Sequence, residues 1–61
     1  MSKERGLVEK KHNGITYTHI VMYHDEVDAR EKERDLQTEG HLTWIEKGGS
    51  EEYYPYHLYY K

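Results

Sequence analysis

The chain has 61 residues, with 9 basic and 12 acidic side chains, which give it a formal net charge of −3. This length allows one domain, so residues 1–61 are expected to form a single small domain. The absence of cysteine excludes disulfide bonds and thiolate zinc sites, two common supports of domains this small. Composition therefore favours oligomerisation as the support, ahead of a histidine-rich metal site.

The sequence has no segment suited to a membrane. The longest stretch without Asp, Glu, Lys or Arg, residues 12–24, is mostly polar, whereas a spanning helix needs about 20 apolar residues. Residues 1–6 are charged and lack a following apolar region, so they do not resemble a signal peptide and are expected to be a flexible N-terminal tail. These features predict a cytoplasmic protein with no membrane contact.

Two β-compatible segments, residues 7–12 and 15–24, flank Asn13-Gly14. An Asn-Gly pair between such segments is the strongest short-range hairpin signal, because a type I′ turn needs positive φ at both positions. The second segment has apolar side chains on both faces, which is typical of a central strand. A two-residue loop predicts four pairs, namely His12 with Ile15, Lys10 with Tyr17, Val8 with His19, and Leu7 with Ile20.

Residues 25–39 are predicted to form a helix that needs a sheet beneath it. Asp25 is a suitable N-cap and Gly40 a suitable C-terminal stop. Glu26 and Arg30 form an attractive pair at i,i+4 spacing, worth a few tenths of a kcal/mol. The apolar stripe is thin and consists of Val27, Ala29 and Leu36.

Residues 41–47 and 51–60 flank Gly48-Gly49-Ser50, which predicts a second hairpin with a three-residue loop. Pro55 has no N–H for a ladder, so the last strand is expected to be an edge strand or to carry a bulge. This register pairs Trp44 with Tyr54 and Leu42 with Tyr56, sets Leu58 on the face of Trp44, and sets Ile45 on the other face with His41 close to His57.

The order of these elements is β-β-α-β-β. It predicts an α+β domain with a four-stranded, mostly antiparallel sheet and one helix packed on one face. One helix covers one face of such a sheet, so a second face with apolar and aromatic side chains stays exposed in this prediction. The sequence leaves open which face the helix covers and in which order the strands lie.

The chain has seven tyrosines and one tryptophan, more aromatic rings than so small an interior is expected to hold. Tyrosine offers a large amphipathic contact area and is enriched at protein interfaces. We therefore predict a small non-catalytic protein-interaction or regulatory module that acts through a tyrosine-rich sheet face, as a homodimer or with another protein. For any single tyrosine, a core position remains the alternative. The expected contact residues are Trp44, Tyr53, Tyr54, Tyr56 and Tyr59.

Two alternative functions follow from the uneven distribution of charge. Lys10 and Lys11 in the basic first hairpin, together with Tyr17, would bind single-stranded nucleic acid by charge and base stacking. The sequence pI of about 5.9 disfavours this function. The acidic segment 25–39 instead suits an inhibitor that engages the basic surface of a nucleic-acid-binding protein, and a viral origin would fit its size.

Catalysis has little support in the sequence. No nucleophile motif, phosphate loop or dinucleotide fingerprint is present, and the carboxylates of segment 25–39 fit a solvated helix face. Five histidines are many for this length, and His19, His41 and His57 would approach one another on one sheet face, yet no ligand motif supports them. We therefore predict neither an enzyme nor a bound metal or cofactor.

Overall fold

The computed structural model describes the backbone of residues 2–61 and the side chains of residues 8–61. Four strands and one helix occur in this part of the chain, in the predicted order. No helix within residues 2–61 combines the length and the apolar character needed to span a bilayer. The elements are β1 Ser2–His12, β2 Ile15–Tyr23, α1 Glu26–Thr38, β3 Thr43–Lys47 and β4 Tyr56–Tyr60.

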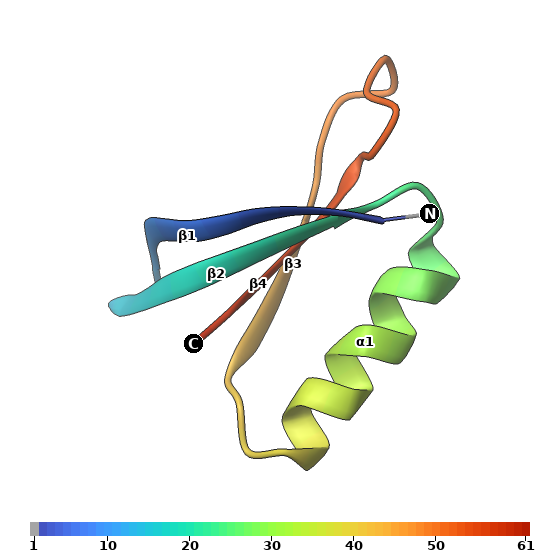
Figure 1. Ribbon diagram of the computed structural model, residues 1–61. Helices are drawn as coiled ribbons and strands as arrows, with labels where there is room; N and C mark the ends of the chain where they lie inside the picture. Colours follow the sequence, from blue (N-terminus) through green and yellow to red (C-terminus); the bar gives the residue numbers. More distant parts are fainter. Residues whose placement is uncertain (1) are drawn as a thin grey trace.

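The strands form one sheet in the order β1-β2-β4-β3, and every neighbouring pair is antiparallel. Helix α1 lies along one side of the sheet (Figure 1), so the predicted α+β class and architecture are confirmed. The prediction that the last strand is an edge is wrong, because β4 lies between β2 and β3. Pro55 directly precedes β4, so the ladder does not need its missing N–H.

The first hairpin turns where the sequence predicts. Asn13 and Gly14 have φ values of 52° and 79°, as a type I′ turn requires. β2 is flanked by β1 and β4 and has buried residues on both faces, which confirms its central position. The predicted pairs nearest the turn are also confirmed, namely His12 with Ile15 and Lys10 with Tyr17.

Two register shifts in β1 overturn the pairs predicted farther from the turn. One lies between Leu7 and Lys10, and the other lies between Glu4 and Gly6. Each inserts one extra residue into β1 relative to β2, and such a bulge bends the strand and increases its twist. The observed pairs are therefore Leu7 with His19 and Gly6 with Ile20, in place of Val8 with His19 and Leu7 with Ile20.

Strand β1 also begins earlier than expected. The sequence predicts a flexible tail over residues 1–6, yet pairing with β2 starts at Ser2, opposite Tyr23. The reason is that β2 continues to Tyr23, and its backbone offers ladder partners to the N-terminal residues along its whole length. Met1 lies outside the described residues.

Helix α1 begins and ends close to the predicted bounds. Asp25 occupies the N-cap position with an extended backbone, although its side chain makes no capping hydrogen bond, and Gly40 follows the helix with a φ of 95°. Ala29 and Leu36 are buried, whereas Val27 is 67% exposed. Val27 and Ala29 are two residues apart, about 200° round the helix, so the inclusion of Val27 in the buried stripe is wrong.

The second hairpin has a different register from the predicted one. Residues 48–55 connect its strands, and Trp44 faces Tyr59 instead of Tyr54. The displacement is five residues, and an odd displacement transfers every side chain of β4 to the other face. Ile45 and Leu58 therefore lie opposite each other. This register keeps Pro55 out of the ladder.

The larger core lies between α1 and the sheet. Leu58 at its centre is 0% exposed, and it comes from β4, one of the two interior strands. Partly buried apolar side chains from β3 and β4 pack around this core. Its buried members are Val21, Tyr23, Ala29, Leu36 and Leu58.

Leu58→Ala should lower the free energy of unfolding by about 2–5 kcal/mol, because it leaves a cavity in a close-packed core. Leu42→Ala is the matched control, since Leu42 is 49% exposed and its truncation should cost no more than about 0.5 kcal/mol. Urea unfolding followed by the fluorescence of Trp44 measures both changes. Equal losses in the two variants would contradict the position of Leu58 in the core.

Candidate functional site

The residues predicted to make contacts lie in three places rather than on one sheet face. One group surrounds Trp44 opposite α1, a second lies in residues 48–55, here called the aromatic loop, and one residue packs near α1. Lys11 is exposed on β1, opposite Thr16. The three groups are Trp44 with Lys10, Tyr17 and Tyr59; Tyr53 with Tyr54; and Tyr56, which lies below the Nζ of Lys47.

The group around Trp44, with His12, is here called the Trp44 cluster. The His12 ring lies 3.9 Å from the Trp44 ring, centroid to centroid, and is tilted from it by 7°. Tyr59 stacks on Trp44 at 4.7 Å, and Tyr17 contacts it at 5.9 Å with a tilt of 46°. These contacts bring the turn end of the first hairpin against β3, although β1 and β3 are the two edges of the sheet. Such ring pairs are each worth about 0.5–1.5 kcal/mol beyond their buried area.

A bend of the first hairpin permits this contact. β2 pairs with β4 only from His19 to Tyr23, so the turn end of the hairpin extends past the end of β4 (Figure 1). Tyr17 and Ile20 both pack on the side opposite α1, although residues three apart in a regular strand point to opposite faces. The register shift in β1 that is nearest the turn lies across the ladder from this part of β2, and it rotates the end of the hairpin.

Lys10 links the hairpin to β3 by an ion pair. Its Nζ lies 2.9 Å from Glu46 Oε1, and it also lies 5.4 Å and 5.2 Å from the ring centroids of Trp44 and Tyr59. The hydrogen bond to Glu46 raises the pKa of the Lys10 ammonium, and this effect exceeds the opposing effect of desolvation. Lys10 is therefore charged at neutral pH, and its charge is compensated within the molecule.

The rings of the Trp44 cluster are buried or half-buried and do not form an open contact surface. Tyr17 and Tyr59 are each 5% exposed, and Val8, Ile15 and Met22 pack against them. The accessible surface of the chain, 4272 Å², is close to the value of about 4,200 Å² that a folded monomer of this mass has. The bent hairpin thus covers much of the sheet face that the sequence-based prediction leaves exposed.

The aromatic loop is held by hydrogen bonds at its base, its tip and its side. Gly48 N–H donates to the Pro55 carbonyl at 2.6 Å, and Glu52 N–H donates to the Gly49 carbonyl at 3.1 Å. The Glu52 carboxylate accepts from Gly49 N–H at 3.3 Å and lies 2.8 Å from Nε2 of His57 in β4. These contacts tie the loop to itself and to the sheet.

Tyr53 is the most exposed aromatic side chain of the aromatic loop, at 56%. Its ring makes a T-shaped contact with Tyr54 at 4.8 Å and lies 4.9 Å from the ring of His24, which follows β2. In the same loop the Glu52 carboxylate lies against Gly48, because a Cβ at Gly48 would lie 2.5 Å from Glu52 Oε2. The fold therefore presents Tyr53 on a hydrogen-bonded loop beside the β2–α1 turn.

The histidines do not meet as the sequence predicts. His57 lies opposite Glu46 rather than beside His41, because the register of the second hairpin differs. His41 and His19 instead contact Tyr60, at ring-centroid distances of 5.4 Å and 4.8 Å. Among the side chains that the structure describes, no group of three or more His, Asp or Glu is arranged to hold a metal ion.

The sequence-based reasoning misses three residues that shape these places. His12 and Glu46 carry no signal for their roles, because only the bend of the hairpin brings them together with residues distant in sequence. Glu52 does carry a signal. It follows Gly48-Gly49 closely, and an exposed N–H group of glycine at a turn can bind a nearby carboxylate.

Lys10→Met should lower stability at neutral pH, because Glu46 loses its partner and the Trp44 cluster loses a cation. A raised folded-state pKa means that the stabilisation is complete below the unfolded value of 10.5 and is lost as pH rises through the folded value. The difference in urea midpoint between wild type and variant should therefore be equal at pH 7 and pH 9. Lys11→Met is the control with no expected change. A difference that shrinks between these two pH values would contradict the assignment.

Gly48→Ala should loosen the aromatic loop without unfolding the domain. The new Cβ displaces the Glu52 carboxylate, which is the end of a flexible side chain, and breaks its bonds to Gly49 and His57. We expect faster amide exchange at Gly49, with the exchange of the core amides of β2 unchanged. Gly49→Ala is the control, because open space surrounds its Cβ position. Equal exchange rates in wild type and Gly48→Ala would disprove the role of Glu52.

Comparison of the chain with protein-family models, with curated proteins and with solved structures finds no match. The candidate contact site is therefore defined by its geometry alone, as an exposed tyrosine on a hydrogen-bonded loop.

Proposed function

We propose that the chain is a small non-catalytic protein-interaction module and that the aromatic loop is its contact surface. The 56% exposure of Tyr53 carries this proposal, since the other predicted contact rings are half-buried or buried. A tyrosine at the centre of an interface supplies a large rigid area with a polar tip, and binding fixes only two side-chain torsions. A partner with a shallow apolar pocket for one phenol ring fits this surface.

The hydrogen bonds that hold the aromatic loop in one conformation also support a binding role. The Glu52 carboxylate links the backbone of Gly49 to the side chain of His57 and so ties the loop to β4. A loop that is already ordered loses less conformational entropy when a partner binds, so more of the contact energy appears as affinity. Tyr54 and His24 lie against Tyr53 and extend the aromatic surface.

The contacts of the Trp44 cluster favour a protein partner over single-stranded nucleic acid. A stacking platform needs exposed rings beside cations that can reach phosphates. Lys10 is bound to Glu46 at 2.9 Å, and Tyr17 is 5% exposed. His12 already stacks on the indole of Trp44. Nucleic acid would have to replace these internal contacts with its own.

The surface of α1 gives less support to an acidic inhibitor of a nucleic-acid-binding protein. Basic residues alternate with the acidic ones along the helix, and Arg30 lies 3.6 Å from Glu26 and 3.1 Å from Glu33. This surface has a net negative charge, but its acidic residues are interrupted by basic ones and do not form a continuous anionic patch. The non-catalytic part of the proposal agrees with the contacts of His57, which binds Glu52 and holds the loop. A cytoplasmic location is part of the same proposal.

Tyr53→Ser tests the proposal, because it removes the exposed ring and leaves the loop backbone in place. The immobilised chain should retain a protein from a nuclease-treated extract of the cells that make it, and the variant should retain at least about tenfold less. Leu42→Ser is the matched control, since Leu42 is exposed but lies outside the aromatic loop. Equal retention by wild type and Tyr53→Ser would contradict the proposal, and so would a protein that is retained only from extract not treated with nuclease.

A further inference from the structure

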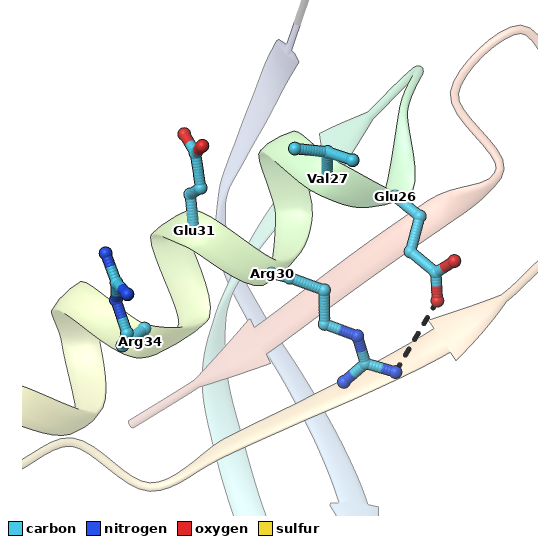
Figure 2. Close-up of a pocket in the computed structure, with 5 residues that line it drawn as sticks. All are labelled: Glu26, Val27, Arg30, Glu31 and Arg34. Carbon is cyan, nitrogen blue, oxygen red and sulfur yellow. Dashed lines mark ion pairs between the residues drawn. The ribbon is translucent and has the colours of Figure 1, made fainter.

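No other element within the described part of the chain packs on the outer face of α1. Val27, Glu31 and Arg34 project from this face and line a shallow, open depression of about 430 Å³, beside Glu26 and Arg30 (Figure 2). Val27 is 67% exposed, more than any other large apolar side chain among residues 8–61. The face thus combines one exposed apolar side chain with charges of both signs.

Glu31 and Arg34 have no ion-pair partner among the described side chains. Arg30, by contrast, lies 3.6 Å from Glu26 and 3.1 Å from Glu33, and the first of these pairs is the dashed contact in Figure 2. Both Glu31 and Arg34 are exposed to solvent. They are therefore charges that a second molecule can compensate.

The spacing of these two residues makes the face complementary to itself. Positions 31 and 34 lie within about 60° of each other round the helix, so they share one stripe. If two helices pack antiparallel about a two-fold axis that passes midway between these positions, Glu31 of each copy faces Arg34 of the other. The same axis places Val27 opposite Thr38. The Thr38 hydroxyl already donates to the Arg34 carbonyl at 2.9 Å, which leaves its methyl group for apolar contact.

We propose that the outer face of α1 docks against the same face of a second copy of this chain, with the two helices antiparallel. Charge complementarity favours a second copy of the chain as the partner and an antiparallel orientation of the two helices. A parallel pair would set Glu31 against Glu31 and Arg34 against Arg34. The paired charges stay near solvent, so the dimer is reversible and is weakened by salt. These residues lie outside the aromatic loop, so the dimer does not rest on the proposed function.

Sedimentation equilibrium of the whole chain, from micromolar to about millimolar concentration, tests this proposal. The mass should rise with concentration from 7.4 kDa toward twice that value. Glu31→Arg and Arg34→Glu each create two like-charge contacts across the axis, so each should weaken the dimer at least about tenfold. The double variant reverses both charges and should dimerise as wild type does. An equimolar mixture of the two single variants should form a mixed dimer.

Lys32→Glu is the matched control, because it changes the net charge as Arg34→Glu does but lies about 200° from Arg34 round the helix. Its dimerisation should stay within about twofold of wild type, and circular dichroism checks that each variant keeps its helix. A monomeric mass for wild type at every concentration would overturn the proposal. A double variant as weak as the single variants would also overturn it. Loss of the dimer in Tyr53→Ser would place the interface at the aromatic loop instead.

Discussion

A four-stranded sheet has two faces, and the single helix α1 covers only one of them. The rest of the structure depends on how the other face is removed from water. The turn end of the first hairpin bends onto that face and buries Tyr17 and Tyr59 beside Trp44. Bulges in β1 accompany the bend, and the ion pair of Lys10 with Glu46 joins the hairpin to β3. Aromatic packing here supports a small domain that has no cysteine for a disulfide.

The bend of the first hairpin over this sheet face decides which surfaces stay accessible to solvent. Tyr17 and Tyr59, two rings that look like contact residues in the sequence, become core, whereas Tyr53 in the aromatic loop stays exposed. The two sheet edges are poorly suited to strand addition, because β1 is charged and bulged and β3 is short. The aromatic loop and the outer face of α1 remain, and they differ in chemistry. The first offers an exposed ring, and the second offers charges that match a copy of themselves.

The candidate site shows how far residue types alone can lead. Tyr53 is among the contact residues that the sequence predicts, but its exposure comes from a loop rather than from a sheet face. Trp44 and Tyr59 belong to the same predicted set and are packed against the first hairpin. Residue type identifies an aromatic ring as a good contact group. It does not show whether the ring meets a partner molecule or another part of the same chain.

The sequence by itself determined the features that depend on neighbouring residues. These are the order of the elements, the turn at Asn13-Gly14 and the bounds of α1, because backbone torsions and helix ends respond to local chemistry. Only the tertiary structure decided the β3–β4 register, the central place of β4 and the bend that buries Tyr59. Each of these depends on which distant side chains pack together. A strand repeats every two residues, so its own pattern admits several registers, and burial of Leu58 under α1 selects one of them.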